Sequence, residues 1–127
     1  MIIEGQYLTF VEYQALGGTL DLTPFNLLEY EARREIDAKT QNRLVNETDI
    51  PQEVKLCMFK LINTLEQYTN ETNRTIASES VGSYSVNYKD NVEQIVKSKN
   101  VELDDLISYY LYGVVINDEH ILYLGVD

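Results

Sequence analysis

The chain has 127 residues, a formal net charge of -11, 44% hydrophobic residues and 24% charged residues. This length predicts one domain spanning residues 1–127, and the composition excludes a collagen-like or wholly disordered chain. No apolar run approaches the roughly 20 residues that span a bilayer, and the N-terminus lacks a signal-peptide pattern, so we expect neither export nor membrane attachment. The acid excess also argues against a surface that gains affinity by neutralising nucleic-acid phosphates.

The first predicted helix covers about residues 9–16. Thr9 and Glu12 have the spacing of a capping box, in which each side chain accepts a hydrogen bond from the other residue's backbone N–H. The Gly17-Gly18 pair that follows is a typical helix terminator.

A second helix is predicted over about residues 24–44. Thr23 suits the N-cap, and Pro24 suits the first helical position, where its missing N–H costs nothing. The charged residues of this segment, Glu29 among them, are expected to cover the outward side. The inward stripe consists of Phe25, Leu28, Ala32 and Ile36.

A third helix, about residues 51–69, is apolar on more than one side. Its main stripe includes Cys57 and Leu61, and the single cysteine fits a small buried thiol in a reducing compartment. Leu56 and Phe59 lie on the opposite side and would stay exposed in a lone helix. We therefore expect a second layer or another subunit to cover them.

The segment after the third helix is predicted to be extended. Residues 69–75 carry no apolar side chain and predict a loop. Between residues 83 and 88 large side chains alternate with small polar ones, which is typical of a half-buried strand, and Gly82 permits a bend before it. We expect an extended arm over about residues 76–88.

The C-terminal part predicts a fourth helix, about residues 101–112, and a short β element in the tail, 114–127. Asn100 suits the N-cap and Gly113 the C-terminal stop, and Tyr109 and Tyr112 lie off the inward stripe. Two apolar runs, 114–116 and 121–124, flank a polar turn and favour a hairpin or a pair of short strands. The expected fold is therefore mainly α, a small helical bundle with an extended arm or hairpin.

The residues that carry chemistry are too few to predict a catalytic, metal or cofactor site. One histidine, His120, and one cysteine stand far apart in the chain, so neither a nucleophile–base pair nor a closed zinc site is expected. The acids at 102, 104 and 105 are better explained as partners of a helix N-terminus than as metal ligands. Gly-rich phosphate-binding motifs are absent from the sequence. We expect no enzyme and no cofactor.

Tyrosine is unusually frequent, with ten copies and no tryptophan. For Tyr30, Tyr68 and Tyr110 core packing is the expected role. The remaining tyrosines of the C-terminal half are equally consistent with packing and with an interface, where tyrosine buries area and keeps a polar handle. These residues are Tyr84, Tyr88, Tyr109, Tyr112 and Tyr123.

Several segments, taken in order, resemble the head-tail connector proteins of tailed bacteriophages. The resemblance begins with Phe25-x2-Leu28-x3-Ala32-x3-Ile36-Asp37-x2-Thr40-x2-Arg43 and continues through the apolar helix from Val54. It includes Ile76-Ala-Ser-Glu-Ser-Val-Gly82-Ser-Tyr-Ser-Val-Asn-Tyr88 and a tyrosine-rich helix ending at Gly113, and so covers nearly the whole chain. The motif positions are Ala32, Ile36, Asp37, Thr40, Arg43, Ser80 and Gly82. One departure is the polar insertion at 117–120, where a shorter connection is expected.

The resemblance implies a structural virion protein that forms a ring of about twelve copies beneath the portal protein. Such an adaptor extends the channel through which DNA passes without specific binding, and it presents a surface to the downstream head-completion (stopper) or tail protein. Its place would be the portal vertex between head and tail of the virion, and the host cytoplasm during assembly. The residues expected at subunit or portal interfaces are Leu56, Phe59, Val81, Tyr84, Val86, Tyr88, Tyr109, Tyr112 and Tyr123.

Alternatives remain open at each level. Asp37, Thr40 and Arg43 fit a helix-stabilising set better than a subunit contact, whereas residues 76–88 fit an interacting arm slightly better than an edge of the chain's own core. A rival function is an acidic DNA-mimic inhibitor of a DNA-binding enzyme, although residues 24–44 balance four acids with four bases. A small hydrolase is a weaker third option, since His120 is the one plausible base.

Overall fold

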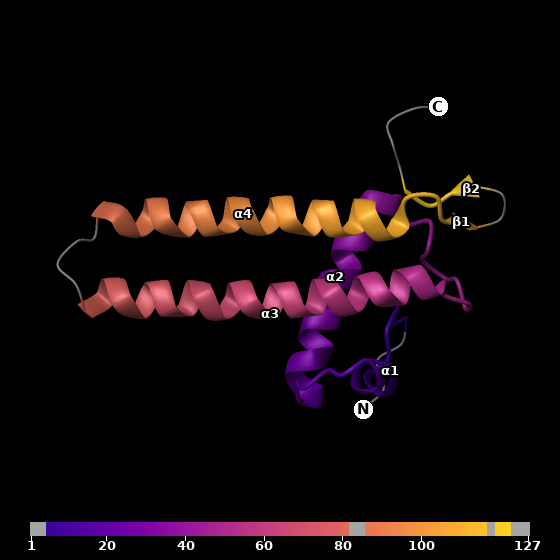
Figure 1. Ribbon diagram of the computed structural model, residues 1–127, viewed down its shortest axis with the longest axis horizontal. Coiled ribbons are helices and arrows are strands. Elements are labelled where there is room, and N and C mark those ends of the chain that lie inside the picture. The colour runs from indigo at the N-terminus through magenta and orange to yellow at the C-terminus, as the bar shows by residue number, and fades with distance from the viewer. Residues whose placement is uncertain (1–4, 82–85, 117–118, 123–127) are drawn as a thin grey trace.

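The computed structural model describes residues 5–81, 86–116 and 119–122, with the side chains of 75–81 and 86–90 left aside. Its helices are α1 (Phe10–Ala15), α2 (Leu22–Thr40), α3 (Gln52–Val81) and α4 (Val86–Leu111). The strands β1 (Val115–Ile116) and β2 (Glu119–His120) follow. As Figure 1 shows, α3 and α4 run antiparallel as a long hairpin, and α2 crosses them near one end. The protein is therefore mainly helical with a short β element, as the sequence predicts.

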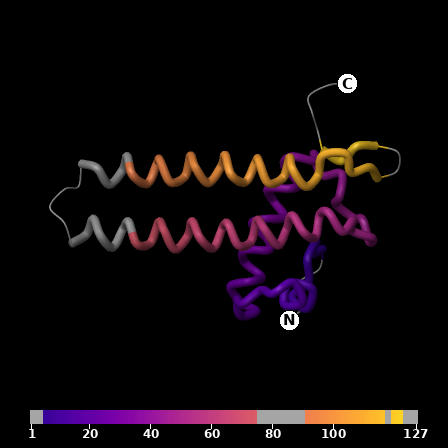
Figure 2. The backbone as a smooth tube through the Cα atoms, viewed as in Figure 1, coloured from indigo at the N-terminus to yellow at the C-terminus, as the bar shows by residue number. Residues whose placement is uncertain are grey.

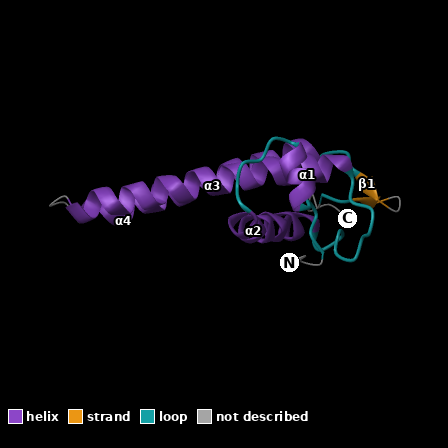
Figure 3. Ribbon diagram, turned by 90° about the horizontal axis from the view of Figure 1, so that it is seen from below, coloured by secondary structure: helices purple, strands orange, loops and turns teal. Residues whose placement is uncertain are grey.

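The core lies where α2 crosses the hairpin. Each helix contributes fully buried apolar side chains there, such as Ile36 from α2, Leu61 from α3 and Ile107 from α4. Figure 3 shows the hairpin continuing well beyond the region that α1 and α2 occupy. In that continuation none of the described side chains after Leu65 of α3 or before Leu103 of α4 is fully buried. The body thus holds the apolar core, and the described part of the outer hairpin has only a half-buried seam.

The first predicted helix is confirmed in detail. Thr9 caps α1, with Glu12 N donating to Thr9 Oγ1 at 3.2 Å and Thr9 N donating to Glu12 Oε1 at 3.0 Å. After the helix, Gly18 passes so close to the Tyr13 ring that an added Cβ would stand 2.2 Å from a ring carbon. The Tyr13 hydroxyl accepts bonds from the backbone N–H groups of Thr19 and Leu20 at 3.1 and 3.0 Å. This turn therefore requires the absence of a side chain at position 18.

The second helix is confirmed, but its predicted ends were wrong. It begins at Leu22 with Asp21 as N-cap, because the N–H of Phe25 donates to the Asp21 carbonyl at 3.0 Å. It ends at Thr40, since Gln41 and Asn42 both adopt left-handed backbone angles, with φ of 50° and 61°. Residues 41–46 form turns instead of the last helical turn that was expected.

The expected loop at 69–75 and extended arm at 76–88 are corrected by the structure. Helix α3 runs unbroken to Val81, and α4 already begins at Val86; residues 82–85 of the expected arm lie outside the described residues. Helix propagation explains the result, because residues 52–81 contain neither Gly nor Pro to stop a helix once it has started. Across the hairpin the Tyr68 hydroxyl donates to Glu102 Oε2 at 2.7 Å, which ties the two helices together.

The fourth helix is longer than predicted, and the tail forms a hairpin. Asn100 lies inside α4 and caps nothing, whereas Gly113, with φ of 84°, follows the helix end as expected. Strands β1 and β2 pair antiparallel, with Val115 opposite His120. The second strand precedes the expected run 121–124, of which the described Ile121 and Leu122 are buried instead. The backbone path is traced in Figure 2.

Candidate interaction surfaces

The outward side of α4 carries large apolar side chains with no cover. Tyr109 and Tyr112 are 79% and 76% exposed, and Val101 is 60% exposed. At 100° per residue, positions 101, 105, 109 and 112 fall within about 80° of one another, so they form one stripe. Asp105 lies within this stripe and is exposed. We name residues Val101, Asp105, Tyr109 and Tyr112 the α4 stripe.

The outward side of α2 carries a second stripe. Leu27 is 61% exposed and Tyr30 is 51% exposed, so the core role expected for Tyr30 is wrong. Arg34 and Ala38 continue the same line and are exposed. The guanidinium of Arg33 lies 5.5 Å from the centroid of the Tyr30 ring, within the range of a cation–π contact. We name Leu27, Tyr30, Arg34 and Ala38 the α2 stripe.

Two of the predicted interface residues belong to the body. Phe59 was expected to be covered by a second layer or by another subunit, and α1 covers it: its ring lies 5.8 Å from that of Tyr13, and the side chain is half-buried against the core. Leu56 is also half-buried. The second layer that the sequence left open is therefore α1 in the case of Phe59.

Several predicted site residues lie outside what the structure describes. No side chain is described for the positions predicted in the arm and at the chain end, so their interface role stays a prediction. These positions are Ser80, Val81, Gly82, Tyr84, Val86, Tyr88 and Tyr123.

The motif residues of α2 make contacts within the chain. Ala32 and Ile36 are fully buried, and the Thr40 hydroxyl donates to the Ile36 carbonyl at 2.9 Å. Asp37 accepts a hydrogen bond from the Tyr7 hydroxyl. Arg43 Nη1 donates to the His120 carbonyl at 3.0 Å and so joins the turn after α2 to the C-terminal hairpin. These contacts favour the structural interpretation over a subunit contact.

A buried carboxylate, Glu29, anchors the N-terminal segment to α2. Its Oε2 accepts the Tyr7 N–H at 3.0 Å, and its Oε1 lies 3.0 Å from Nη2 of Arg33. Arg33 Nη1 in turn donates to the Gly5 carbonyl at 3.2 Å. Burial raises the pKa of Glu29, and this effect outweighs the opposing effects of Arg33 and the backbone N–H groups of Tyr7 and Leu8. The outward position expected for Glu29 was wrong.

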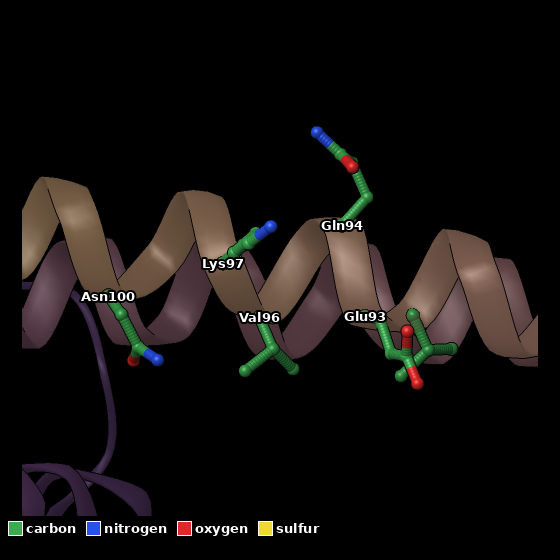
Figure 4. A pocket seen from close by; sticks show the side chains of 6 residues that line it. Glu93, Gln94, Val96, Lys97 and Asn100 are labelled. Carbon is green, nitrogen blue, oxygen red and sulfur yellow. The ribbon is translucent and has the colours of Figure 1, made fainter.

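Two hollows lie on the surface of the described part of the chain. One, of about 490 Å³, lies along a single helix, α4, and Figure 4 shows Gln94 pointing away from Val96 and Asn100. Another, of about 540 Å³, lies between the N-terminal segment, α2 and the following turns, beside Arg33 and Asp37. Within the described ranges no group of three or more His, Cys, Asp or Glu residues could hold a metal ion.

Leu27 and Val101 were not among the residues predicted to lie at an interaction surface, yet both are exposed. A helical wheel could have found both, because Leu27 lies about 160° from Phe25 on α2 and Val101 lies about 160° from Leu103 on α4. The sequence does not show that Leu27 and Tyr30 belong to one exposed stripe, because this depends on which side of α2 packs against the hairpin.

Comparison of the chain with protein-family models, with curated proteins and with solved structures gives no match. Among the helices in the described ranges, none is both long enough and apolar enough to cross a bilayer.

Proposed function

We propose that the protein is a head-tail connector of a tailed bacteriophage, a ring-forming adaptor that sits under the portal protein and receives the next head-completion protein or the tail. The observation that carries the proposal is the presence of two separate exposed stripes, on α2 and α4, in a chain of 127 residues. A subunit of a cyclic ring uses two different surfaces, one for each neighbour.

The long helical hairpin supports the same proposal. Its 30-residue α3 is about 45 Å long, whereas the buried apolar residues lie in the part near α2. The described outer half of the hairpin, with half-buried Tyr68, Thr72 and Ile95 along its seam, buries little apolar area for its length. Neighbouring copies or the portal protein would add the burial that this half lacks.

The distribution of acids suits a channel-forming adaptor. From Val101 onward the chain has six acids and no Lys or Arg. Carboxylates facing the lumen would repel DNA phosphates and keep the DNA from adhering as it moves, an effect that added salt weakens.

The acidic DNA-mimic function has less support. A mimic needs a continuous array of carboxylates, but the α4 stripe places Val101, Tyr109 and Tyr112 around Asp105. Asp104 is also paired with Lys39 of α2 at 2.9 Å. Aromatic side chains between the acids are more typical of a protein interface.

Electron microscopy of a lysate from a phage that lacks this gene tests the proposal. We expect free tails beside tailless heads that have leaked their DNA, and a plasmid copy of the gene should restore tailed particles. The exposed α3 residue Gln67 provides a matched control, because a plasmid copy with Gln67→Ala should restore them equally well. Normal tailed particles without the gene would refute the connector function, and inhibition of a DNA-binding enzyme would then be measured.

A further inference from the structure

We infer that the α2 stripe of one copy packs antiparallel against the α4 stripe of the next copy, so that the chain assembles head to tail through these two helix faces. The inference rests on the proposed function in that both require several copies of the chain, but it names the contact, and each can fail without the other.

The spacing of the two stripes is the first observation. In the α2 stripe, Leu27, Tyr30, Arg34 and Ala38 are separated by three, four and four residues. In the α4 stripe, read backwards, Tyr112, Tyr109, Asp105 and Val101 have the same separations. When two antiparallel helices have equal spacings, each stripe residue of one helix lies at the same height along the contact as a stripe residue of the other; we call such residues level. This arrangement suits the interdigitation of rows spaced three and four residues apart.

The second observation is the chemistry that this register brings together. Arg34 comes level with Asp105, so the positive charge of one stripe meets the negative charge of the other. On one side of this pair Tyr30 is level with Tyr109 and Leu27 with Tyr112, and all four are more than half exposed in the single chain. A central charge pair beside apolar and aromatic side chains gives both register and burial.

The positions that flank the central charge pair are of mixed character. Ala38 is level with Val101, a small residue against a larger one, and Glu31 is level with Ser108. Both Glu31 and Ser108 are exposed in the single chain.

The same register also brings two pairs of acids level at the edges of the contact, Asp37 with Glu102 and Glu35 with Asp104. Within the chain Asp37 accepts a bond from Tyr7, Glu102 accepts one from Tyr68, and Asp104 is paired with Lys39. Juxtaposed like charges are unfavourable, so the central pair of Arg34 and Asp105 carries the charge complementarity of the contact.

A contact of either stripe with its own copy is disfavoured by charge. A two-fold pairing of the α4 stripe about its middle would bring two exposed Asp105 carboxylates together. The same pairing of the α2 stripe about Arg34 would oppose two guanidinium groups. Only the mixed pairing neutralises both charges, so the contact uses two different surfaces and can continue from copy to copy.

Charge exchange in the purified full-length chain tests the contact. Arg34→Asp and Asp105→Arg should each weaken self-association in sedimentation by about tenfold or more, because each creates a like-charge pair. The double variant should regain the self-association of the unmodified chain, while Gln67→Ala should leave it unchanged. Both charged side chains are exposed, and far-UV circular dichroism checks that each variant folds.

Cross-linking between two single variants separates the possible pairings. Cys57 is buried and its pKa is raised to about 12, so its thiol will not compete. Ala38→Cys mixed with Val101→Cys should be joined by a short bismaleimide into a dimer that neither variant gives alone. Ala38→Cys mixed with Gln67→Cys serves as the control and should give none.

Each other outcome overturns the inference. A dimer from Ala38→Cys alone, or from Val101→Cys alone, would establish a two-fold contact instead. A single charge variant that assembles normally, a double variant that does not recover, or a chain that stays monomeric and uncross-linked at its solubility limit would each refute the mixed pairing. Loss of tailed particles in the gene deletion would still stand in these cases, so the proposed function would survive. Conversely, the cross-link with normal phage assembly would refute the function and keep the contact.

Discussion

Removal of the buried carboxylate of Glu29 should be among the most damaging single changes in this protein. Glu29 has no exposed surface, and it holds the N-terminal segment to α2 through the Tyr7 N–H and through Arg33. Glu29→Ala would leave the Tyr7 N–H without its acceptor and would leave Arg33 with the Gly5 carbonyl but no carboxylate partner. The larger part of the energetic cost should come from Arg33, because its Nε atom is already buried without a hydrogen-bond partner in the described structure.

The expected loss follows from what remains buried. Removing one member of a buried ion pair costs about 3–5 kcal/mol, because the other charge stays desolvated and uncompensated. Glu29→Gln retains one carbonyl acceptor and should cost less, about 1–3 kcal/mol. Both values are a large part of the 5–15 kcal/mol by which domains are usually stable. Urea unfolding followed by circular dichroism measures them.

The pH dependence provides a second test with a defined sign. The pKa of Glu29 is raised by burial, so the folded chain binds a proton at a higher pH than the unfolded chain does. The contribution of Glu29 to stability is therefore fully present below the unfolded pKa and declines as the pH rises through the folded pKa. The stability difference between the unmodified chain and Glu29→Gln should thus grow as the pH falls from 7 toward about 4.

The exposed Glu31 of the same helix is the matched control. Glu31→Gln should change the free energy of unfolding by less than about 0.5 kcal/mol. If Glu29→Ala proves as mild as Glu31→Gln, the anchoring role of Glu29 is refuted. If the stability difference for Glu29→Gln shrinks in acid, the raised pKa of Glu29 is refuted.

Three further changes have directions that the structure defines. Gly18→Ala should lower the melting temperature strongly, because the new Cβ would overlap the Tyr13 ring, and differential scanning calorimetry measures the loss. Glu12→Gln should destabilise at neutral pH and lose this effect in acid: burial opposes ionisation of Glu12, but its bonds with Lys55 and Thr9 lower the pKa, so its contribution is lost as the pH falls through the folded value. The Cys57 thiol, with its pKa raised to about 12 by burial, should react with a thiol reagent only after unfolding.

Each of these expectations has its own contrary result. Gly17→Ala meets no atom within 4 Å but requires a φ of 100°, so it should cost only the strain of a left-handed residue, about 1–2 kcal/mol. A Gly18→Ala variant no less stable than Gly17→Ala would contradict the close approach. Equal acid sensitivity with and without Glu12 would contradict the capping contact, and rapid labelling of the folded chain would place Cys57 at the surface.

The local signals in the N-terminal third were strong enough to predict α1 and the presence of α2. A capping box, a Gly pair and a stripe repeated at helical spacing all act within a few residues, so they can be read without tertiary information. The position of Glu29 could not be read in this way. It depends on residues 5–8, which fold back over α2. The hydrogen bond from the Tyr7 N–H to Glu29 joins residues that are 22 positions apart in the sequence.

The prediction of a loop and an arm in the long hairpin was wrong because it gave more weight to local polar composition than to helix propagation. A run of Thr, Asn and Glu resembles a loop, but residues 52–81 and 83–112 contain no Gly or Pro, and Gly82 lies between them. Val92, Ile95 and Lys99 also repeat at helical spacing upstream of the predicted start of the fourth helix, and all three are half-buried in α4. The alternation at residues 83–88 spans too few residues to define a strand against these signals.

The sequence could identify candidate interface residues, but it could not show which of them are exposed in the folded chain. Tyr109 and Tyr112 lie off the inward face of α4, which Leu103 and Ile107 share, and this was enough to indicate exposure. Phe59 satisfied the same criterion, yet α1 covers it, because exposure is decided by which elements pack together. The periodicity of one helix therefore identifies candidates, and only the fold separates the surface from the second layer.

The two stripes are held in a defined relation by the body of the protein. The inner sides of α2 and α4 belong to one core, through Ile36 and Ile107, and Lys39 and Asp104 join the two helices directly. Close-packed cores resist deformation, so the direction in which one stripe faces relative to the other is set by how α2 crosses the hairpin. If copies join stripe to stripe, this crossing also sets the turn from one subunit to the next and hence whether the assembly closes. The curvature of the proposed ring is then determined by the packing of the core, whereas the affinity between neighbouring subunits is determined by the exposed residues of the two stripes.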